Sequence, residues 1–290
     1  MLKISCVIVT FNSAEIIEMC IRSILEDINE YTFEIIVIDN ASSDDTMNIL
    51  CELKKSINEH LILIENLTNF GYTRAVNQGL VKAGGEYLLL LNPDTRIHKD
   101  FFKRSLEFFE NNEGYGVLGP QHLDFSGNIK RTCREFPGYF SLLSHISGLS
   151  YIFPKSKIFS RWKMGYFDHK GSREVDQPMG ACLFMRSTDQ KEVGYLDERF
   201  RMFFSDVDMC RRFKERKKPA YFCSEIKIDH EEGHSIKKHP VKMIMSSHNA
   251  FHRYFRKYYN KWYHIFPNIF IFFVLVLTGI LRILLLPFKR

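Results

Sequence analysis

The most constraining feature of this sequence is the run of four leucines from Leu88 to Leu91, which is followed at once by Asn92-Pro93-Asp94. An apolar run of this kind between turn-forming residues predicts a strand buried on both faces, as in a parallel sheet covered by helices. Asn92 and Asp94 would then emerge at the carboxyl end of a central strand, where open α/β sheets bind their ligands. A carboxylate there can hold a divalent cation, although the same residues also suit an ordinary turn.

Three earlier apolar segments also end in polar residues. The segments are 4–9, 34–38 and 61–64, and the polar stretches that follow them contain Asn12, Asp39 and Gly71. Helical patterns separate the segments, and Ser42 and Asp45 have capping-box spacing at the start of one of them. This alternation predicts an α/β fold with a mainly parallel sheet flanked by helices and right-handed crossovers. The polar residues, together with Asp94, would therefore line one edge of the sheet and form a site.

One motif match is rejected on its context. Residues 114–119 fit the dinucleotide pattern GxGxxG, but they follow a helix pattern, and Pro120 blocks the helix that should carry the pyrophosphate. We interpret them as a loop entering a short strand. The first strand-to-helix turn, where a dinucleotide fingerprint belongs, contains no glycine, so hydride transfer is disfavoured.

The second half of the chain supplies a candidate base. Residues 121–175 have no clear hydrophobic periodicity and are expected to form a variable region or lid. Further along, Ser205 and Asp208 again have capping-box spacing. They precede a helical pattern whose inward-facing stripe would contain Val207, Cys210 and Phe213. Asp206 would lie in the first turn of this helix, where the partial positive charge favours an ionised carboxylate. Such a group can accept a proton, and the alternative is a simple helix-terminal charge.

Three histidines follow the next apolar segment. His230, His234 and His239 invite a zinc interpretation, but no cysteine is near and the spacing fits no closed site. A single histidine, His230, joining a cation held by Asp94 is the more economical hypothesis.

The end of the chain has a different character. Residues 265–281 carry no charge, and the apolar run continues past Arg282 to Leu286, about 33 Å as a helix. We expect a membrane-anchoring helix over 264–290 and a basic, aromatic membrane-proximal segment over 239–263, behind a catalytic domain over 1–238. The alternative is a buried core helix. Much of the excess positive charge lies late in the chain, which favours anionic lipid over nucleic acid as a partner.

The cellular location is predicted from two further features. The amino terminus runs directly into a strand pattern without a signal peptide, and the seven cysteines form no CxxC pair, as is typical of a reduced cytosolic protein. With the apolar tail, this predicts the cytoplasmic face of the cell membrane.

Taken together, five stretches resemble the family 2 glycosyltransferases, inverting enzymes of the GT-A fold that use nucleotide-sugar donors. Within that family the chain is similar to rhamnosyltransferase-like enzymes of bacterial surface polysaccharide synthesis. The stretches cover most of residues 4–235 and are 7–12, 37–42, 69–72, 91–94 and 204–208.

The resemblance implies roles for individual residues. Asp39 is similar to the aspartate that contacts the nucleotide base, Asp94 to the metal-binding carboxylate of the Asp-x-Asp motif, and Asp206 to the catalytic base. His230 is similar to the histidine that helps to hold the metal or diphosphate. The remaining residues expected to bind the nucleotide-sugar are Thr10, Asn12, Asn69, Gly71, Asn77 and Asn92. Two positions depart from the family pattern, because Asn92 replaces the first acid of Asp-x-Asp and Ser205 replaces the usual glutamate before the base.

The activity implied is a single displacement at the anomeric carbon, with Asp206 as general base and Mg²⁺ or Mn²⁺ neutralising the departing nucleoside diphosphate. The donor would be a nucleotide-diphosphate sugar, with rhamnose as one candidate sugar, and the acceptor a lipid-linked saccharide or polysaccharide. Two alternatives stay open. A nucleotidyltransferase would use a similar sheet but usually a Gly-rich basic first loop, and a catalytically impaired, nucleotide-sugar-binding membrane scaffold is compatible with Ser205.

Overall fold

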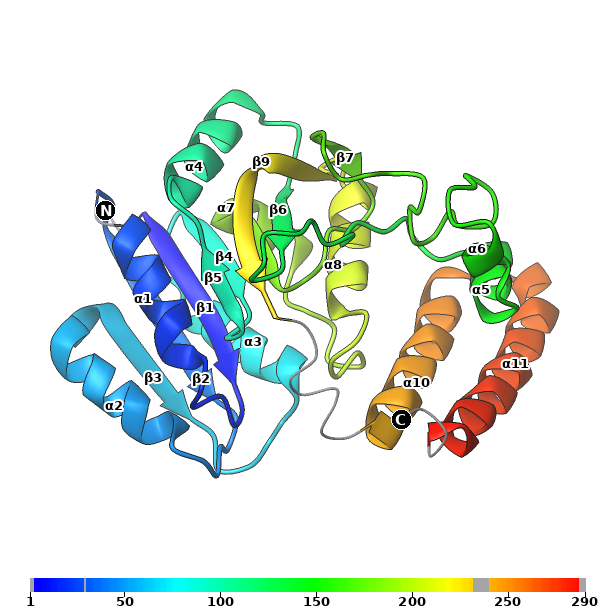
Figure 1. Ribbon diagram of the computed structural model, residues 1–290, viewed down its shortest axis with the longest axis horizontal. Coiled ribbons are helices and arrows are strands. Elements are labelled where there is room, and N and C mark those ends of the chain that lie inside the picture. The colour runs from blue at the N-terminus through cyan, green and yellow to red at the C-terminus, as the bar shows by residue number, and fades with distance from the viewer. Residues whose placement is uncertain (1–2, 29, 232–239, 287–290) are drawn as a thin grey trace.

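The computed structural model describes residues 3–28, 30–231 and 240–286, which form one α/β sheet domain with a pair of long helices at one end (Figure 1). The strands are β1 (Ile4–Thr10), β2 (Phe33–Asp39), β3 (Leu61–Glu65), β4 (Tyr87–Leu91), β5 (Thr95–Ile97), β6 (Val117–Leu123), β7 (Arg173–Val175), β8 (Cys182–Arg186) and β9 (Ala220–His230). The helices are α1 (Ile17–Asp27), α2 (Thr46–Ile57), α3 (Tyr72–Lys82), α4 (Phe101–Asn111), α5 (Tyr139–Ile146), α6 (Leu149–Ile152), α7 (Ser187–Val193), α8 (Ser205–Glu215), α10 (Pro240–Tyr258) and α11 (Ile265–Leu284).

The sheet has the order β3-β2-β1-β4-β8-β6-β9-β5, and β7 pairs with β9. The first four strands are parallel, as the βα alternation predicts, and the predicted α/β class is confirmed. Beyond β4 the sheet is mixed, because β8 runs antiparallel to β4 and to β6. The long segment before β8 is not a simple crossover helix, so nothing constrains β8 to the parallel direction.

Both faces of β1, β2 and β4 are largely buried, which explains the nearly continuous apolar sequences of these strands. On one face Cys6 and Ile8 of β1 belong to a core cluster with α1, and on the other face Val7 and Val9 pack against α3. Gly79 permits that second contact, because a Cβ atom there would lie 2.4 Å from Cγ1 of Val7. The strand ends are therefore held in fixed positions by helices on both sides.

A separate apolar cluster joins the long helices to the domain. Phe204 and Val207 at the start of α8 are buried with Phe251 and Tyr254 of α10, and Leu275 of α11 belongs to the same cluster. Figure 1 shows α10 beside α8 and α11 outside α10. α11 is apolar enough and long enough to cross a membrane, with a mean hydropathy of 2.2 over an 18-residue window within 262–284, yet only 11% of that window is buried. A buried core helix, the alternative considered above, would be covered to a much greater extent.

Two of the expected local details are wrong. Neither capping box forms: α2 begins at Thr46 and α8 at Ser205, each without a side-chain hydrogen bond at its cap. Ser42 bonds to Asp39 instead, and the chain enters α8 through Phe204 in the left-handed region at φ 71°. Residues 114–119 lead into strand β6 as predicted, and the weakly patterned 121–175 region contains α5, α6 and β7.

Candidate active site

The ends of β1 and β2 are joined by a small hydrogen-bond network. The Asn12 amide N–H donates to Ser42 Oγ at 2.8 Å, while the Ser42 hydroxyl donates to Asp39 Oδ1 at 2.5 Å and its amide to Oδ2 at 2.9 Å. Asn12 Oδ1 accepts from the Ser43 amide at 2.8 Å. Thr10 ends β1 with a buried hydroxyl that has no hydrogen-bond partner among the described residues. The predicted residues Thr10, Asn12 and Asp39 are thus brought together at one edge.

The loop after β3 is fastened to this edge by Asn40. Its Nδ2 donates to Asn69 Oδ1 at 3.0 Å, its Oδ1 accepts from the Phe70 amide at 3.0 Å, and its own amide donates to Thr10 O at 2.8 Å. Asn69 Oδ1 also accepts from the Gly71 amide at 2.9 Å. Gly71 has φ 87°, and a Cβ atom there would lie 3.1 Å from Arg201 O, so glycine suits the position in both respects. Asn40 was not among the predicted site residues, although it directly follows Asp39 in the sequence.

The carboxylate of Asp94 faces His230, which in turn contacts a second histidine. Asp94 Oδ1 is buried, accepts no hydrogen bond among the described residues, and lies 3.4 Å from His230 Nε2. His230 ends β9, and its Nδ1 lies 3.3 Å from Nδ1 of His122 in β6. Burial, and then the neighbouring His230, holds the pKa of His122 well below its ordinary value, so this imidazole is neutral. His122 was not predicted, because its contact with His230 depends on the pairing of β6 with β9.

Asp206 lies beside the end of β4. Its Oδ2 accepts hydrogen bonds from Gln177 Nε2 at 2.7 Å and from the Gly180 amide at 3.1 Å, and its Oδ1 accepts from the Val207 amide at 2.9 Å. The neighbouring Ala181 O accepts from the Asn92 amide at 2.8 Å, which places Asp206 next to the Asn92-Pro93-Asp94 turn.

Two opposing effects act on the acidity of Asp206. Burial raises its pKa above the ordinary aspartate value, and the hydrogen bonds from Val207, Gly180 and Gln177 only partly oppose that shift. The pKa of Tyr72 is raised, first by burial and then by the charges of Asp206 and Asp94. Tyr72 is therefore close enough to Asp94 and Asp206 for both charges to affect it.

Asn77 does not join this edge. Its Nδ2 donates to Leu196 O at 2.9 Å and to Glu198 Oε1 at 3.1 Å, and its Oδ1 accepts from the Leu196 amide at 2.9 Å. These contacts fasten α3 to the loop before α8. Asn77 thus has a structural role, and its prediction as a donor-binding residue is corrected.

The residues at this edge fit a divalent cation that is shared with a ligand. Among the described residues, no group of three or more histidine, cysteine or acidic side chains is arranged to hold a metal. Asp94 Oδ1 and His230 Nε2 nevertheless face each other, and a buried carboxylate oxygen without a partner is a natural cation ligand. With two protein ligands, most of the coordination would come from water and from a bound diphosphate. His234 and His239 lie outside the described residues.

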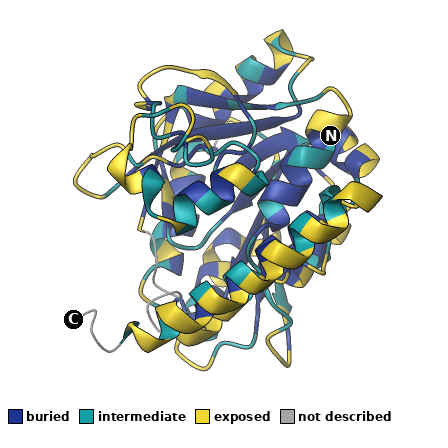
Figure 2. Ribbon diagram, turned by 90° about the vertical axis from the view of Figure 1, so that its right-hand side faces the viewer, coloured by how far each residue is buried: buried dark blue, intermediate teal, exposed yellow. Residues whose placement is uncertain are grey.

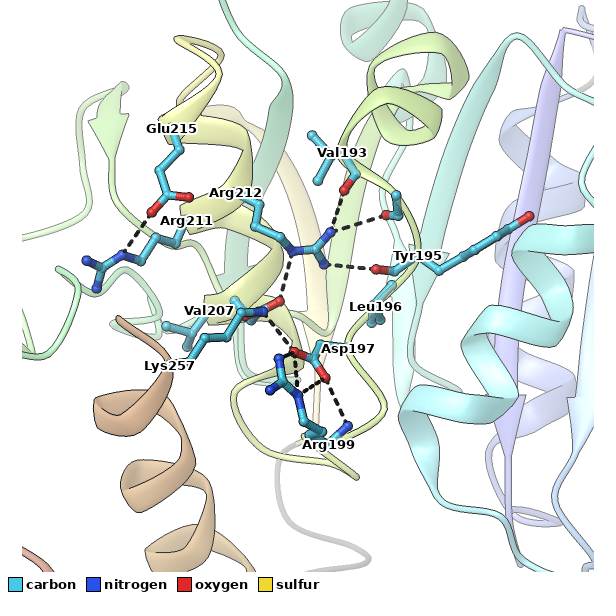
Figure 3. Close-up of polar contacts among 12 residues, drawn as sticks. Val193, Tyr195, Leu196, Asp197, Arg199, Val207, Arg211, Arg212, Glu215 and Lys257 are labelled. Carbon is cyan, nitrogen blue, oxygen red and sulfur yellow. Dashed lines mark hydrogen bonds and ion pairs between the residues drawn. The ribbon is translucent and has the colours of Figure 1, made fainter. Parts of the chain in front are cut away.

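The helix that carries Asp206 is also anchored by a buried charge cluster (Figure 3). Asp208 Oδ2 accepts from Arg212 Nε at 2.9 Å, and Oδ1 accepts from Lys257 Nζ and, at 2.7 Å, from the Tyr258 hydroxyl. Lys257 also pairs with Asp197 at 2.8 Å. We call these five residues the clasp. It links α8 to α10 and keeps the start of α8 in place.

A sheet of this topology with carboxylates and a histidine at its strand ends defines the GT-A class of glycosyltransferases. The chain belongs to glycosyl transferase family 2, whose family description matches residues 5–171. It is 22% identical over 258 residues to the N-acetylglucosaminyl-diphospho-decaprenol L-rhamnosyltransferase of Mycobacterium tuberculosis, covering 84% of this chain and 81% of the relative. It is 28% identical to the GalNAc(5)-diNAcBac-PP-undecaprenol beta-1,3-glucosyltransferase of Campylobacter jejuni, covering 69% of this chain and 64% of that protein.

Solved structures show the same fold. The mannosyltransferase PcManGT from Pyrobaculum calidifontis, in complex with GDP-Man and Mn²⁺, superposes with a TM-score of 0.59 at 13% identity, covering 88% of this chain and 64% of that one. GalNAc-T7 with UDP, GalNAc and Mn²⁺ gives 0.59 at 15% identity, covering 79% and 44%. S. aureus TarS gives 0.55 at 16% identity, covering 86% and 39%. This chain therefore spans less than two thirds of these solved chains.

Proposed function

We propose that the protein is an inverting, metal-dependent glycosyltransferase that moves a sugar from a nucleotide-diphosphate donor to a lipid-linked saccharide during cell-surface polysaccharide synthesis. The observation that carries the proposal is the pair of carboxylates at one sheet edge, namely the half-buried Asp206 and Asp94, whose Oδ1 accepts no hydrogen bond within the described part of the chain. The activities named for the Mycobacterium and Campylobacter relatives support a polyprenol-linked acceptor. The first of them makes rhamnose a candidate sugar.

The edge provides complementary partners for a nucleotide-sugar. Asp39 would accept from the base, and Thr10, Asn12, Asn69, Gly71 and Asn92 would line the path of the nucleoside and diphosphate. The buried Thr10 hydroxyl, which finds no hydrogen-bond partner in the part of the chain that the structure describes, would gain one when that site fills. Asp94 and His230 would hold the cation, which neutralises charge on the diphosphate as it departs.

Asp206 would act on the acceptor. Its raised pKa keeps the carboxylate basic enough to remove the proton from an acceptor hydroxyl as that oxygen attacks the anomeric carbon. Gln177 and Gly180 orient the carboxylate through Oδ2. In this reaction Ser205 needs no catalytic role, because its hydroxyl donates to Met202 O and its side chain is buried.

The apolar α11 would keep the protein at the cytoplasmic face of the membrane, where a lipid-linked acceptor is available. The exposure of most of α11 and the basic residues around it support this location.

The test is hydrolysis and binding of nucleotide-sugars by Asp94→Ala. The variant should lose metal-dependent hydrolysis and metal-dependent donor binding, because the remaining ligand His230 is uncharged when it binds metal. Titration calorimetry with Mn²⁺ and a panel of donors, scored also by thermal stabilisation, measures both losses. Glu192→Ala, an exposed carboxylate on α7, is the matched control. An unchanged metal response in Asp94→Ala would move the site elsewhere, and metal-dependent binding without hydrolysis or transfer in the wild type would favour the scaffold alternative.

A further inference from the structure

The way α11 packs bears on how it meets a membrane. The uncharged polar residues Asn268 and Thr278 and the buried Gly279 lie on the stripe of α11 that faces the rest of the protein. Asn268 Nδ2 donates to Tyr259 O at 2.8 Å, Asn268 Oδ1 accepts from the Tyr139 hydroxyl at 2.7 Å, and Thr278 Oγ1 lies 3.5 Å from His248 Nε2. Contacts with α10 and its flanks thus run from the first turns of α11 to its last turns.

The other faces of α11 are apolar and uncovered. Phe266 is 80% exposed, and the same surface includes Ile269, Phe270, Phe273, Val276, Leu277, Ile280, Leu281 and Leu284. This is a far larger exposed apolar surface than a helix in water normally carries. Figure 2 shows this face of α11 turned to the viewer, with exposed positions along its whole length.

A second exposed apolar segment lies on the same side of the molecule. Tyr151, Ile152, Phe153 and Ile158 are exposed at the end of α6 and in the turn after it, and both views place α5 and α6 beside α11 (Figures 1 and 2). α5 is bonded to α11 directly through the Tyr139–Asn268 contact. The apolar surface therefore comes from two segments that are more than a hundred positions apart in the sequence.

The two segments that form this surface carry basic residues and no acidic ones. Residues 136–167 contain Lys155, Lys157, Arg161 and Lys163 but no aspartate or glutamate, and residues 233–290 contain lysines and arginines but again no acid. These two acid-free stretches are the ones that carry the apolar surface. An apolar face whose own segments carry cations but no acids is complementary to a bilayer with anionic headgroups, although Arg161 is paired with Glu135 just outside them.

α10 decides the orientation of α11. To cross a bilayer, α11 would need its whole length of about 30 Å within hydrocarbon, and α10 packs along most of that length. α10 carries the exposed Lys242, Arg253 and Arg256, which hydrocarbon strongly disfavours, and its Lys257 is bonded to Asp208 of the domain. A spanning α11 would have to leave α10 and break the Asn268 and Thr278 contacts.

We propose that α11 lies in the plane of one membrane leaflet instead of crossing the bilayer, and that residues 151–158 insert beside it, so that the protein docks on anionic lipid through one two-part surface. The inference rests on the membrane location in the proposed function and specifies its geometry. Because the clasp joins α10 to α8, docking through this surface would fix the position of Asp206 relative to the bilayer.

The first experiment determines on which side of the membrane the end of the chain lies. In a Cys51→Ser background, which removes the exposed native thiol, Lys289→Cys and, as a reference in the domain, Glu113→Cys are labelled with a membrane-impermeant maleimide. An in-plane α11 leaves both positions unlabelled in intact cells and labelled in inside-out vesicles. Labelling of Lys289→Cys, but not of Glu113→Cys, in intact cells would show a spanning helix and overturn the proposal.

The second experiment tests the 151–158 segment. Ile152→Asp should weaken binding of the full chain to phosphatidylcholine vesicles containing phosphatidylglycerol on the order of ten-fold, because an apolar side chain is replaced by a charge that the lipid repels. Val81→Asp is the matched control, since Val81 on α3 is 64% exposed and Ile152 is 68% exposed. High salt or omission of phosphatidylglycerol should also weaken the wild-type binding. Equal binding of Ile152→Asp and wild type, or binding insensitive to anionic lipid, would contradict the two-part surface.

Donor-induced thermal stabilisation of the same variants separates the two proposals. It should be unchanged in Ile152→Asp, which also shows that the variant is folded. Vesicle binding without any donor binding would contradict the proposed activity but would still support the proposed docking geometry.

Discussion

The strand-end edge and the clasp contain similar polar side chains, but these side chains differ in whether they have hydrogen-bond partners within the protein. At the edge, Thr10 Oγ1, Asp94 Oδ1 and His122 Nε2 are buried without a hydrogen-bond partner among the described residues. At the clasp, the carboxylate of the fully buried Asp208 accepts hydrogen bonds from Arg212, Lys257 and the Tyr258 hydroxyl. A buried polar atom without a partner costs about 1–3 kcal/mol, so the two regions differ in free energy as well as in geometry.

This difference indicates which polar residues serve a ligand and which serve the fold. Partners missing at the edge are the ones that a diphosphate, a cation or an acceptor hydroxyl would supply. Asp206 and Asp208 lie two residues apart on one helix and point into the two different regions. Asp206 accepts hydrogen bonds from uncharged groups, whereas Asp208 is paired with Arg212 and Lys257. Substitutions at and around these aspartates therefore test whether one region serves a ligand and the other serves the fold.

The largest effect is expected from Asp206→Asn. The amide keeps the shape of the side chain and loses its basicity, so sugar transfer should fall on the order of 10²-fold or more while donor binding survives. Radiolabelled transfer to a lipid-linked acceptor and donor-induced thermal stabilisation measure the two properties. Glu215→Gln, an exposed acid on the same helix, should behave like wild type. Transfer by Asp206→Asn within a few-fold of wild type would show that another group is the base.

A smaller loss is expected from Gly180→Ala. A Cβ atom at Gly180 would lie 2.8 Å from both Cβ and Oδ2 of Asp206, so the carboxylate must move. We expect transfer to fall about ten-fold with little change in donor affinity, because displacement of a catalytic group affects the reaction more than binding. Gly114→Ala, where a Cβ atom would meet nothing within 4 Å, is the control. Equal kcat values for the two variants would mean that the position of Asp206 is not limiting.

Lys257→Met tests the clasp. The substitution keeps an extended apolar side chain and removes the ammonium from Asp208 and Asp197, leaving Asp208 with Arg212 and Tyr258. The free energy of unfolding should fall by about 2 kcal/mol, a decrease in Tm of roughly 5 °C, with donor affinity unchanged. Thermal unfolding in detergent measures it, with the exposed Lys261→Met as the control. A loss of donor affinity without a loss of stability would place Lys257 in the ligand site.

The stability lost in Lys257→Met should itself depend on pH. Burial alone would raise the pKa of Asp197, but hydrogen bonds from Arg199 and Lys257 hold it well below its ordinary value. The contribution of Asp197 is thus present above the ordinary aspartate pKa and disappears as the pH falls through the lowered value.

The sequence predicts the edge better than it predicts the clasp, for a physical reason. Apolar strands followed by polar turns identify β1 to β4 in the sequence. Parallel strands then bring Asn12, Asp39 and Asp94 to the same edge of the sheet, whatever the exact strand boundaries are. The contacts of Asn77 with Leu196 and Glu198 depend on how α3 meets a loop far along the chain, so the local sequence did not reveal its role. The clasp likewise depends on α10 packing beside α8.

The site also contains residues from β6 and from the segment before β8. Local sequence patterns do not predict that these residues reach the site. His122 reaches His230 only because β6 and β9 pair in a mixed sheet, and Gln177 reaches Asp206 from a region with no regular periodicity. The apolar character of residues 265–284 was plain from composition. Which of its faces would be covered was not, because that depends on the tertiary contacts of Asn268 and Thr278.

The smallest effect, and the sharpest contrast between the two regions, concerns the stability of Asp206→Asn. Because the pKa of Asp206 is raised, its contribution to stability is present below the ordinary aspartate pKa and is lost as the pH rises through the raised value. Near neutral pH the folded protein holds a charge that its surroundings disfavour, so Asp206→Asn should slightly raise Tm there, and the gain should vanish at acid pH. Asparagine keeps only one acceptor oxygen, so it loses the hydrogen bond from Val207 or those from Gln177 and Gly180, and this loss keeps the gain small.

Asp208→Asn should do the reverse, lowering the free energy of unfolding by about 3 kcal/mol because Arg212 and Lys257 lose their buried partner. Thermal unfolding of both variants across the same pH range makes the comparison direct. If the two substitutions shifted Tm in the same direction at neutral pH, the distinction between a carboxylate held ready for an acceptor and one held by the fold would fail.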